Sequence, residues 1–232
     1  MKNYSVEVLV MAHYAQRSEN MLKLINALKN QTYKHMYITV FDDGEIDLDV
    51  EGVNYIRTTD MYHITARNSL AAMSAADYVL TIDDDMIPGT RYVENLIKYA
   101  RNLPGSIIGV EGGRLVPGDT PYTSGMTEST HIMVEVDYLI RSMLLPHKVI
   151  GASVDMHCRN REKIGSEFID DLLFSLANKY MLKNTNFIVP AKGDFGYDNI
   201  SDMGVGQSKS SQHYLTRDMF CKYIMEEYAN IS

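Results

Sequence analysis

Short apolar runs alternate with amphipathic stretches along the first half of the chain. The apolar runs have the length of buried strands, and the stretches between them carry apolar side chains at helical spacing. The predicted strands are Val6–Met11, Met36–Phe41, Val53–Arg57 and Tyr78–Ile82. The predicted helices are one capped by Ser18 that carries Met21, Leu22, Ile25 and Leu28, one over Thr65–Ala76 and one over Thr90–Asn102. Strands that alternate with helices indicate an α/β fold with parallel strands covered by helices.

The second half has a less regular pattern. We expect strands at Ser106–Gly112, His131–Val136 and Ala152–His157, and helices at Asp170–Leu182 and Arg217–Tyr228. A stretch rich in Gly, Ser, Thr and Pro predicts a surface loop over Gly118–Thr130. Residues 192–212 show no periodicity and predict a mobile loop, and loops of that length are usually functional or disordered. Neither a repeat nor a low-complexity linker divides residues 1–232, so we expect one domain.

Charge and composition narrow the possible partners. The formal net charge of -8 opposes the broad positive field that nucleic-acid binding needs, so we expect no nucleic-acid partner. The first apolar run is short and contains Glu7, which fits neither a signal peptide nor a membrane span. Together with two distant cysteines, Cys158 and Cys221, expected as reduced thiols, this favours a cytoplasmic protein.

Polar residues follow three of the predicted strands. They are Ala12-His13-Tyr14, Asp42-Asp43-Gly44 and Asp83-Asp84-Asp85. In a parallel sheet covered by helices, ligands bind beyond the carboxyl ends of the strands. These three segments therefore predict one binding site.

The acidic run 83–85 is the sharpest of the three signals. Adjacent carboxylates repel one another unless a cation or strong donors offset their charge. Oxygen ligands suit Mg²⁺ or Mn²⁺, and alternation along an extended chain would place Asp83 and Asp85 on one side and Asp84 on the other. The alternative is an acidic turn that caps the helix beginning near Thr90.

Several short motifs occur in the order found in one enzyme family. They are Gln31-Thr32-Tyr33, Asp42-Asp43-Gly44, Ala66-Arg67-Asn68-Ser69-Leu70 and Asp83-x-Asp85-Met-Ile-Pro. With the preceding strand and helix, the chain resembles GT-A glycosyltransferases, especially family-2-like members. The resemblance implies a single GT-A domain over residues 1–232, with a mostly parallel central sheet flanked by helices and a small antiparallel element in the second half. Residues 1–103 would bind a nucleotide sugar and residues 104–232 an acceptor.

The resemblance also implies roles for residues in the donor site. Asp42 would accept a hydrogen bond from the imide N–H of uracil, which favours a UDP-sugar such as a UDP-hexose. Asp83 would meet the ribose or the metal, with Asp84 beside it, and Asp85 would bind a metal that bridges the two phosphates. The other donor-site candidates are Ala12, His13 and Tyr14 for the base and ribose, and Arg67, Arg17 and Lys209 for the phosphates.

Late in the chain, the same family provides a metal ligand and a base. A histidine on a loop over the diphosphate would be His213, which suggests Mn²⁺ over Mg²⁺. The acidic pair Asp170-Asp171 fits a general base at the head of a helix, with Asp171 as the better candidate. A base at Asp171 favours inversion, and a retaining mechanism is the alternative. The alternative to a base is that both carboxylates only favour the helix dipole. The family's Gln-x-x-Arg-Trp element is missing, and the chain contains no Trp, which argues against processive polymerisation.

The expected reaction is therefore metal-dependent transfer of a sugar from a nucleotide diphosphate to a hydroxyl of a glycan or oligosaccharide. A non-catalytic module of the same fold that binds sugar nucleotides or glycans is an alternative. A nucleotidyltransferase is another, although the segment after the first strand lacks the glycines of a phosphate loop.

Overall fold

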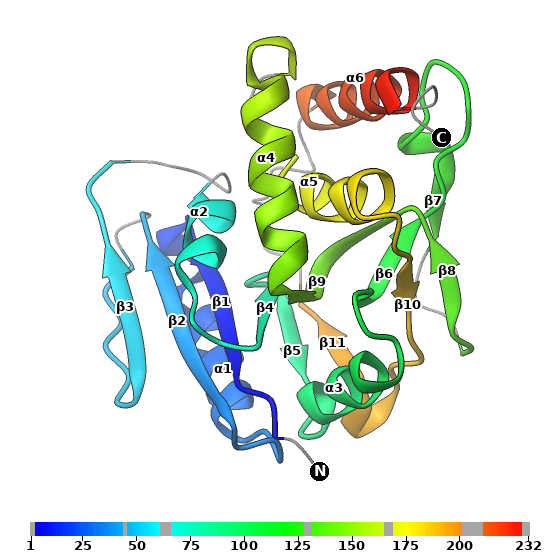
Figure 1. The fold of residues 1–232 in the computed structure, drawn as a ribbon. Coiled ribbons are helices and arrows are strands. Elements are labelled where there is room, and N and C mark those ends of the chain that lie inside the picture. The colour runs from blue at the N-terminus through cyan, green and yellow to red at the C-terminus, as the bar shows by residue number, and fades with distance from the viewer. Residues whose placement is uncertain are drawn as a thin grey trace.

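One large sheet forms the centre of the molecule. The computed structural model describes residues 3–43, 46–60, 66–127, 131–164, 169–200 and 211–228. Four parallel strands make up one side of the sheet in the order β3-β2-β1-β4 (Figure 1). Their bounds are β1 (Val6–Ala12), β2 (Met36–Asp42), β3 (Val53–Arg57) and β4 (Tyr78–Ile82).

The sheet continues on the far side of β4 with mixed strand directions. β9 (Tyr138–Pro146) pairs antiparallel with both β4 and β6 (Ile107–Gly113), so β6 runs in the direction of β4. β10 (Asn186–Ile188) is parallel to β6, whereas β8 (Val134–Val136) and β7 (Met126–Thr127) run against their neighbours. Most strands of this sheet therefore share one direction within the described part of the chain, as the expected mostly parallel sheet requires.

Helices cover both faces of the sheet because its strands alternate apolar side chains between the two faces. On one face, Val6, Val8 and Val10 of β1 pack with α1 (Ser18–Lys29) and α3 (Tyr92–Asn102). On the other face, Leu9 belongs to a cluster that includes residues of α2 (Ala66–Met73), α4 (His147–Ile164) and α5 (Asp170–Leu176). Each fully buried Val or Leu contributes roughly 1.5–3 kcal/mol through the hydrophobic effect.

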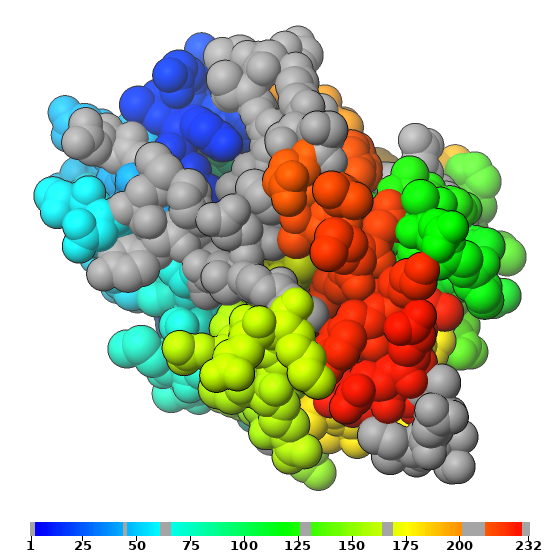
Figure 2. Space-filling model, turned by 90° about the horizontal axis from the view of Figure 1, so that it is seen from above, coloured from blue at the N-terminus to red at the C-terminus, as the bar shows by residue number. Residues whose placement is uncertain are grey.

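A third hydrophobic cluster joins the helices of the second half to one another. A π-helical turn, Ala177–Met181, continues α5, and α6 (Ser211–Tyr228) packs over α4 and α5. Figure 2 shows α6 next to α4 on the upper face of the molecule. Phe220, Cys221 and Ile224 of α6 are fully buried there.

The predicted strands of the first half agree with the structure to within one residue at each end. The predicted cap of the first helix is wrong, because Ser18 is already the first residue of α1 and its Oγ donates to the carbonyl of Ala15 at 2.6 Å. Leu22, expected on the buried face of that helix, is exposed, and Leu24 is buried in its place. Cys158 and Cys221 are both free thiols, as expected.

The prediction of a strand at Ala152–His157 is wrong, because this segment lies inside α4. Six residues are too few to show the helical spacing of the buried positions Val149, Ser153, Met156 and Asn160. No element was predicted for residues 138–146, which form the central strand β9.

Two predicted loops also contain ordered elements. Gly118–Thr130 includes a 3₁₀ turn at Thr123–Gly125 and the short strand β7, and residues 128–130 lie outside the described part. In the segment 192–212, a 3₁₀ turn at Gly193–Phe195 leads into β11 (Tyr197–Asn199), which pairs antiparallel with β5 (Met86–Pro88). Backbone pairing of this kind leaves little sequence signal in so short a strand. Residues 201–210 lie outside the described part, and α6 begins at Ser211, earlier than the predicted Arg217.

Candidate active site

The carboxyl ends of β1, β2 and β4 meet at one edge of the sheet. Ala12 of β1 lies opposite Asp42 of β2, and Val10 lies opposite Ile82 of β4, the residue before Asp83. Neighbouring strands are about 5 Å apart, so Asp42 and the beginning of the acidic run are separated by roughly 10 Å across β1. The fold therefore brings the predicted base-binding and phosphate-binding residues to the same edge.

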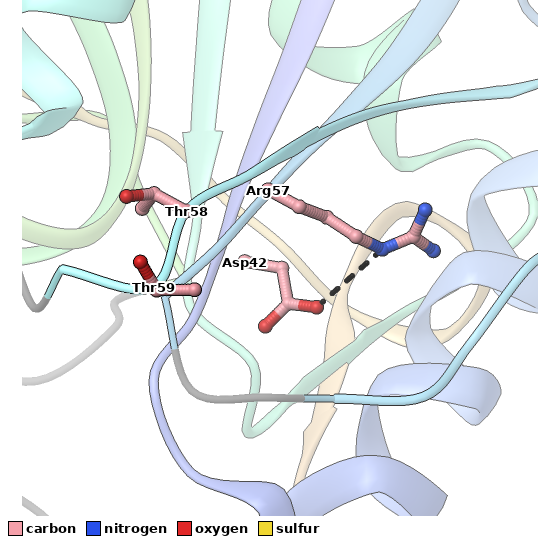
Figure 3. Close-up of a pocket in the computed structure, with 4 residues that line it drawn as sticks. All are labelled: Asp42, Arg57, Thr58 and Thr59. Atoms are coloured by element: carbon pink, nitrogen blue, oxygen red, sulfur yellow. Dashed lines mark ion pairs between the residues drawn. The ribbon is translucent and has the colours of Figure 1, made fainter.

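A pocket of about 480 Å³ lies where β2 and β3 end (Figure 3). It is lined by Asp42, Arg57, Thr58 and Thr59. Asp42 Oδ1 accepts a hydrogen bond from the backbone N–H of Ile46 at 3.0 Å, and its Oδ2 lies 3.7 Å from Arg57 Nε, beyond hydrogen-bonding range. Arg57 was not among the predicted site residues. Its position at the end of a predicted strand, on the same edge as Asp42, is the signal from which it could have been predicted.

The segment after β1 connects this pocket to the acidic run. Nδ1 of His13 contacts Oδ1 of Asp43, which is buried beside the end of β2. The guanidinium of Arg17 lies 5.6 Å from the ring centroid of Tyr14 and pairs with Asp84. His13, Tyr14 and Arg17 therefore lie along the edge from the end of β2 to the end of β4.

The acidic run itself forms a turn. The backbone N–H of Met86 donates to the carbonyl of Asp83 at 3.2 Å, so the chain is not extended here and the predicted alternation of its side chains does not apply. Each carboxylate instead meets an arginine from a different element. The pairs are Asp83 with Arg67 of α2 at 2.9 Å, Asp84 with Arg17, and Asp85 with Arg141 of β9 at 2.7 Å.

These arginines only partly offset the cost of burying the carboxylates. Burial raises the pKa of Asp84 to about 6, although Arg17 opposes the shift. Burial also raises the pKa of Asp83, against the effect of Arg67. Asp83 is the most accessible of the three, with 32% of its side chain exposed. The turn is therefore a site where additional positive charge would be stabilised.

Arg67 links this turn to the head of α5. Its Nη2 lies 2.9 Å from Asp83 Oδ1, and its Nη1 lies 3.0 Å from Asp170 Oδ2. Burial opposes the charge on Arg67, but Asp170 and Asp83 together raise its pKa, so the guanidinium stays charged. Burial likewise raises the pKa of Asp170. Arg67 thus contacts two carboxylates, and its predicted place near the base or the diphosphate stays a prediction.

Asp171 has a counter-ion of its own. Arg217 Nη2 donates to its Oδ1 and Oδ2 at 2.7 and 2.6 Å, and the guanidinium lies 4.5 Å from the ring centroid of Tyr122. Both acidic residues of the pair occupy the first turn of α5, where the helix dipole favours them. The helix dipole is not their only partner, because each carboxylate also pairs with an arginine from another element. A role in stabilising the helix therefore does not rule out a chemical role.

The two remaining predicted residues are on or before α6. His213 is buried on α6, and burial and the neighbouring Arg217 lower its pKa to about 4, so its imidazole is neutral. Lys209 lies outside the described residues. Among those residues, no group of three or more His, Cys, Asp and Glu side chains could hold a metal ion, so His213 does not join Asp83 and Asp85 in such a group here.

A second cluster beside the acidic turn was missed by the sequence reasoning. Arg141 contacts Glu111 at 3.2 Å as well as Asp85, and it also donates to Asn199 Oδ1 at 3.2 Å. The hydroxyl of Tyr197 donates to Glu111. These residues come from β9, β6 and β11. The strand predicted at Ser106–Gly112 agrees with β6 to within one residue, but β9 was not predicted and β11 lies in a predicted loop, so no motif signals the cluster.

The geometry agrees with the comparison to known families. Residues 8–164 match the model of the family described as Glycosyl transferase family 2, which is more than half of the chain. The chain belongs to glycosyl transferase family 2. The GT-A fold expected from the sequence is confirmed, and the alternative of a nucleotidyltransferase is set aside. A search of curated proteins with this sequence found no match.

The family-2 match includes the pocket and the acidic turn and ends at Ile164. Asp170, Asp171 and His213 lie beyond it, and the structure connects Asp170 to the acidic turn through Arg67. In the described part of this glycosyltransferase, no helix combines the length and the apolar character needed to cross a membrane.

The acidic turn of this glycosyltransferase fits a divalent cation. In the network of ion pairs between described residues, six carboxylates face four guanidinium groups, an excess of two negative charges when all are ionised. The carboxylates are those of Asp83, Asp84, Asp85, Glu111, Asp170 and Asp171. Mg²⁺ commonly takes only one or two protein carboxylates, with substrate phosphates and water as its other ligands. Asp83 and Asp85 would be the protein ligands of such a cation.

Proposed function

We propose that this family-2 glycosyltransferase moves a sugar from a nucleoside diphosphate, with UDP favoured, to a hydroxyl of a glycan or oligosaccharide. A divalent cation, Mn²⁺ or Mg²⁺, would bind at Asp83 and Asp85. The observation that carries the proposal is the distance across β1. The pocket at Asp42 and the acidic turn are roughly 10 Å apart on one edge, within reach of the base and the diphosphate of one nucleotide.

The chemistry of the pocket supports a pyrimidine with an imide edge. Uracil presents one N–H donor between two carbonyl acceptors. A carboxylate at Asp42 matches the donor, and the guanidinium of Arg57, about half exposed at the pocket, matches a carbonyl. His13 and Tyr14 are proposed to contact the base and ribose, since they follow β1 between the pocket and the turn.

The diphosphate is proposed to lie over the acidic turn. A bound divalent cation would stabilise the negative charge that develops on the leaving diphosphate. Arg17 and Arg67 hold Asp84 and Asp83 in place, and both guanidinium groups lie at the edge that the phosphates would approach. Lys209, outside the described residues, remains a candidate for phosphate contact.

Asp171 is proposed as the general base. As the acceptor oxygen attacks the anomeric carbon, its proton passes to the carboxylate, and the bond between the sugar and the nucleoside diphosphate breaks. This displacement inverts the anomeric centre. Asp170 differs from Asp171 because its carboxylate is tied to the donor side through Arg67. The proposal therefore gives Asp170 a supporting role in holding Arg67 and gives Asp171 the proton transfer.

Calorimetric titration with UDP, GDP and dTDP, each in Mn²⁺ and again in EDTA, tests the donor site. We expect UDP to bind best and to require the metal, and Asp85→Ala to weaken that binding about a hundredfold. Asp155→Ala is a matched control, because Asp155 pairs with Arg159 on the exposed surface of α4. Equal binding by wild-type protein and Asp85→Ala would refute the metal assignment.

A screen for hydrolysis of UDP-sugars would then identify the transferred sugar. A protein that binds UDP with the metal but turns over no sugar nucleotide, with or without acceptors, would instead support a non-catalytic binding module.

A further inference from the structure

Arg141 has an unusual backbone conformation in the middle of the sheet. Its φ angle is 65°, in the left-handed region that non-glycine residues avoid. It lies where the pairing of β6 with β9 shifts register between Gly109 and Glu111. Strained residues of this kind persist only where their surroundings hold them, and they cluster at functional sites. Here the register shift lies beside the acidic turn, which Arg141 contacts.

Both the backbone and the side chain of Arg141 contact that turn. Its carbonyl accepts from the backbone N–H of Asp83 at 2.9 Å, and its Nη2 lies 2.7 Å from Asp85 Oδ1. Only about 16% of the Arg141 side chain is exposed. The guanidinium is therefore a cation already bound to one of the two carboxylates proposed for the metal.

The guanidinium also has a second anchor on its other side. Its Nη1 lies 3.2 Å from Glu111 Oε1, and Glu111 is itself held by the hydroxyl of Tyr197. Loss of the contact with Asp85 would leave the contact with Glu111 in place. Arg141 can thus release Asp85 without leaving its charge buried and unpaired, which would be costly.

We infer that Arg141 is an internal counter-ion that competes with the divalent cation for Asp85 and so couples metal binding to donor binding. This inference rests on the proposed metal site. Without the nucleotide sugar, a metal that takes Asp85 Oδ1 deprives one N–H of Nη2 of its carboxylate partner, and only the 3.2 Å contact of Nη2 with Asn199 Oδ1 remains. With donor present, a phosphate oxygen offers Nη2 a new partner, so the metal binds more tightly.

The test uses Arg141→Gly, because glycine adopts a left-handed φ readily and removes the side chain without adding backbone strain. Manganese binding is measured with Mn²⁺ alone and again with saturating UDP, by calorimetry or by the electron paramagnetic resonance signal of free Mn²⁺. In the absence of UDP, we expect Arg141→Gly to bind Mn²⁺ about tenfold more tightly than wild-type protein, the effect of one charge-assisted hydrogen bond. We also expect UDP to tighten Mn²⁺ binding by a smaller factor in the variant than in wild-type protein.

Two further proteins make the result specific. Arg141→Lys keeps the positive charge and should bind Mn²⁺ as weakly as wild-type protein. Arg159→Met removes one positive charge from the exposed Asp155 pair on α4 and should also leave Mn²⁺ binding unchanged. A gain in the Arg159→Met control equal to that of Arg141→Gly would show that net charge alone is responsible and would overturn the inference.

Unchanged or weaker Mn²⁺ binding by Arg141→Gly would also overturn it, including the case in which neither protein binds Mn²⁺. Failure of the proposed function gives a different result. In that case wild-type protein fails to bind any of the three nucleotides, while the ratio of Mn²⁺ affinities still reports on Arg141 and Asp85.

Discussion

Two acidic segments meet in this site, and they are held in different ways. At the end of β4, three carboxylates are paired with arginines from three separate elements, and Asp83 keeps 32% of its side chain exposed. At the head of α5, Asp170 and Asp171 are almost fully buried, with side-chain exposures of 2% and 9%. Asp83 can therefore be reached from solvent, whereas Asp170 and Asp171 are nearly closed off from it.

The counter-ions explain this difference. The turn after β4 lies at the edge where the strands end, and each of its carboxylates is paired with a different arginine. The head of α5 lies beneath α6, which provides Arg217 to both oxygens of Asp171. The proposed metal ligand Asp83 is thus partly exposed, while the proposed base Asp171 is closed off by its pairing with Arg217. The predictions below test this contrast.

The largest expected effect is a loss of transfer rate when the proposed base at the head of α5 is changed. Asp171→Asn cannot accept the proton of the acceptor, so we expect the transfer rate to fall by about 10³-fold while UDP affinity stays within twofold of wild type. Asp170→Asn should instead weaken UDP binding as well, because Asp170 holds Arg67 against Asp83. Rates of sugar transfer and UDP titrations measure both. Near-normal transfer by Asp171→Asn would remove it from the mechanism and with it the contrast.

The next largest effect is a loss of folding stability when the ion pair between Arg217 and Asp171 is broken. Arg217→Met leaves the buried carboxylate of Asp171 without its counter-ion, and we expect the free energy of unfolding to fall by about 3 kcal/mol. Urea unfolding measures the change. The double variant Arg217→Met/Asp171→Asn removes the buried charge too and should recover part of the loss. Equal losses in the single and double variants would show that Arg217 contributes through packing on Tyr122 and not through its charge.

The same contrast explains how much of the molecule was predictable. In the first half, β1, β2 and β4 are mostly apolar runs with a polar segment behind each, and the parallel order puts their ends at one edge. Local sequence patterns were therefore sufficient to predict Asp42, Asp83 and Asp85 as neighbours in one site. Arg57 ends β3 at the same edge of the sheet, so the strand-end argument applies to it as well, although it was not among the predicted site residues.

In the second half, tertiary pairing decides the structure. β9 contains the charged Arg141 in its middle and depends on two antiparallel partners, so its sequence does not alternate as an isolated strand would. β11 is held by backbone hydrogen bonds to β5, which any sequence can make. The pairing of Arg217 with Asp171 joins residues 46 positions apart and has no local signal at all.

A smaller effect is expected at the base pocket. Arg57→Met removes a donor from the pocket, so UDP affinity should fall about tenfold while Mn²⁺ binding stays unchanged. Arg91→Met is a suitable control, since Arg91 is an exposed arginine paired with Glu94 on α3. If Arg57→Met binds UDP as wild-type protein does, the base lies elsewhere along the edge.

The last expected effect is a pH dependence confined to the acceptor side. Burial lowers the pKa of His213 to about 4, whereas an unfolded histidine has a pKa near 6.5. Below pH 6.5 the unfolded chain gains a proton that the folded protein does not bind, so stability is lost as the pH falls toward 4. Between pH 7.5 and pH 5 we expect wild-type protein to lose about 2 kcal/mol more than His213→Gln. Burial raises the pKa of Asp84 to about 6 and acts in the opposite direction, but it does so in both proteins and cancels in their difference. Urea unfolding at the two pH values measures that difference. A loss of the same size in His213→Gln would mean that the imidazole is already solvated, and that the head of α5 is as accessible as the turn after β4.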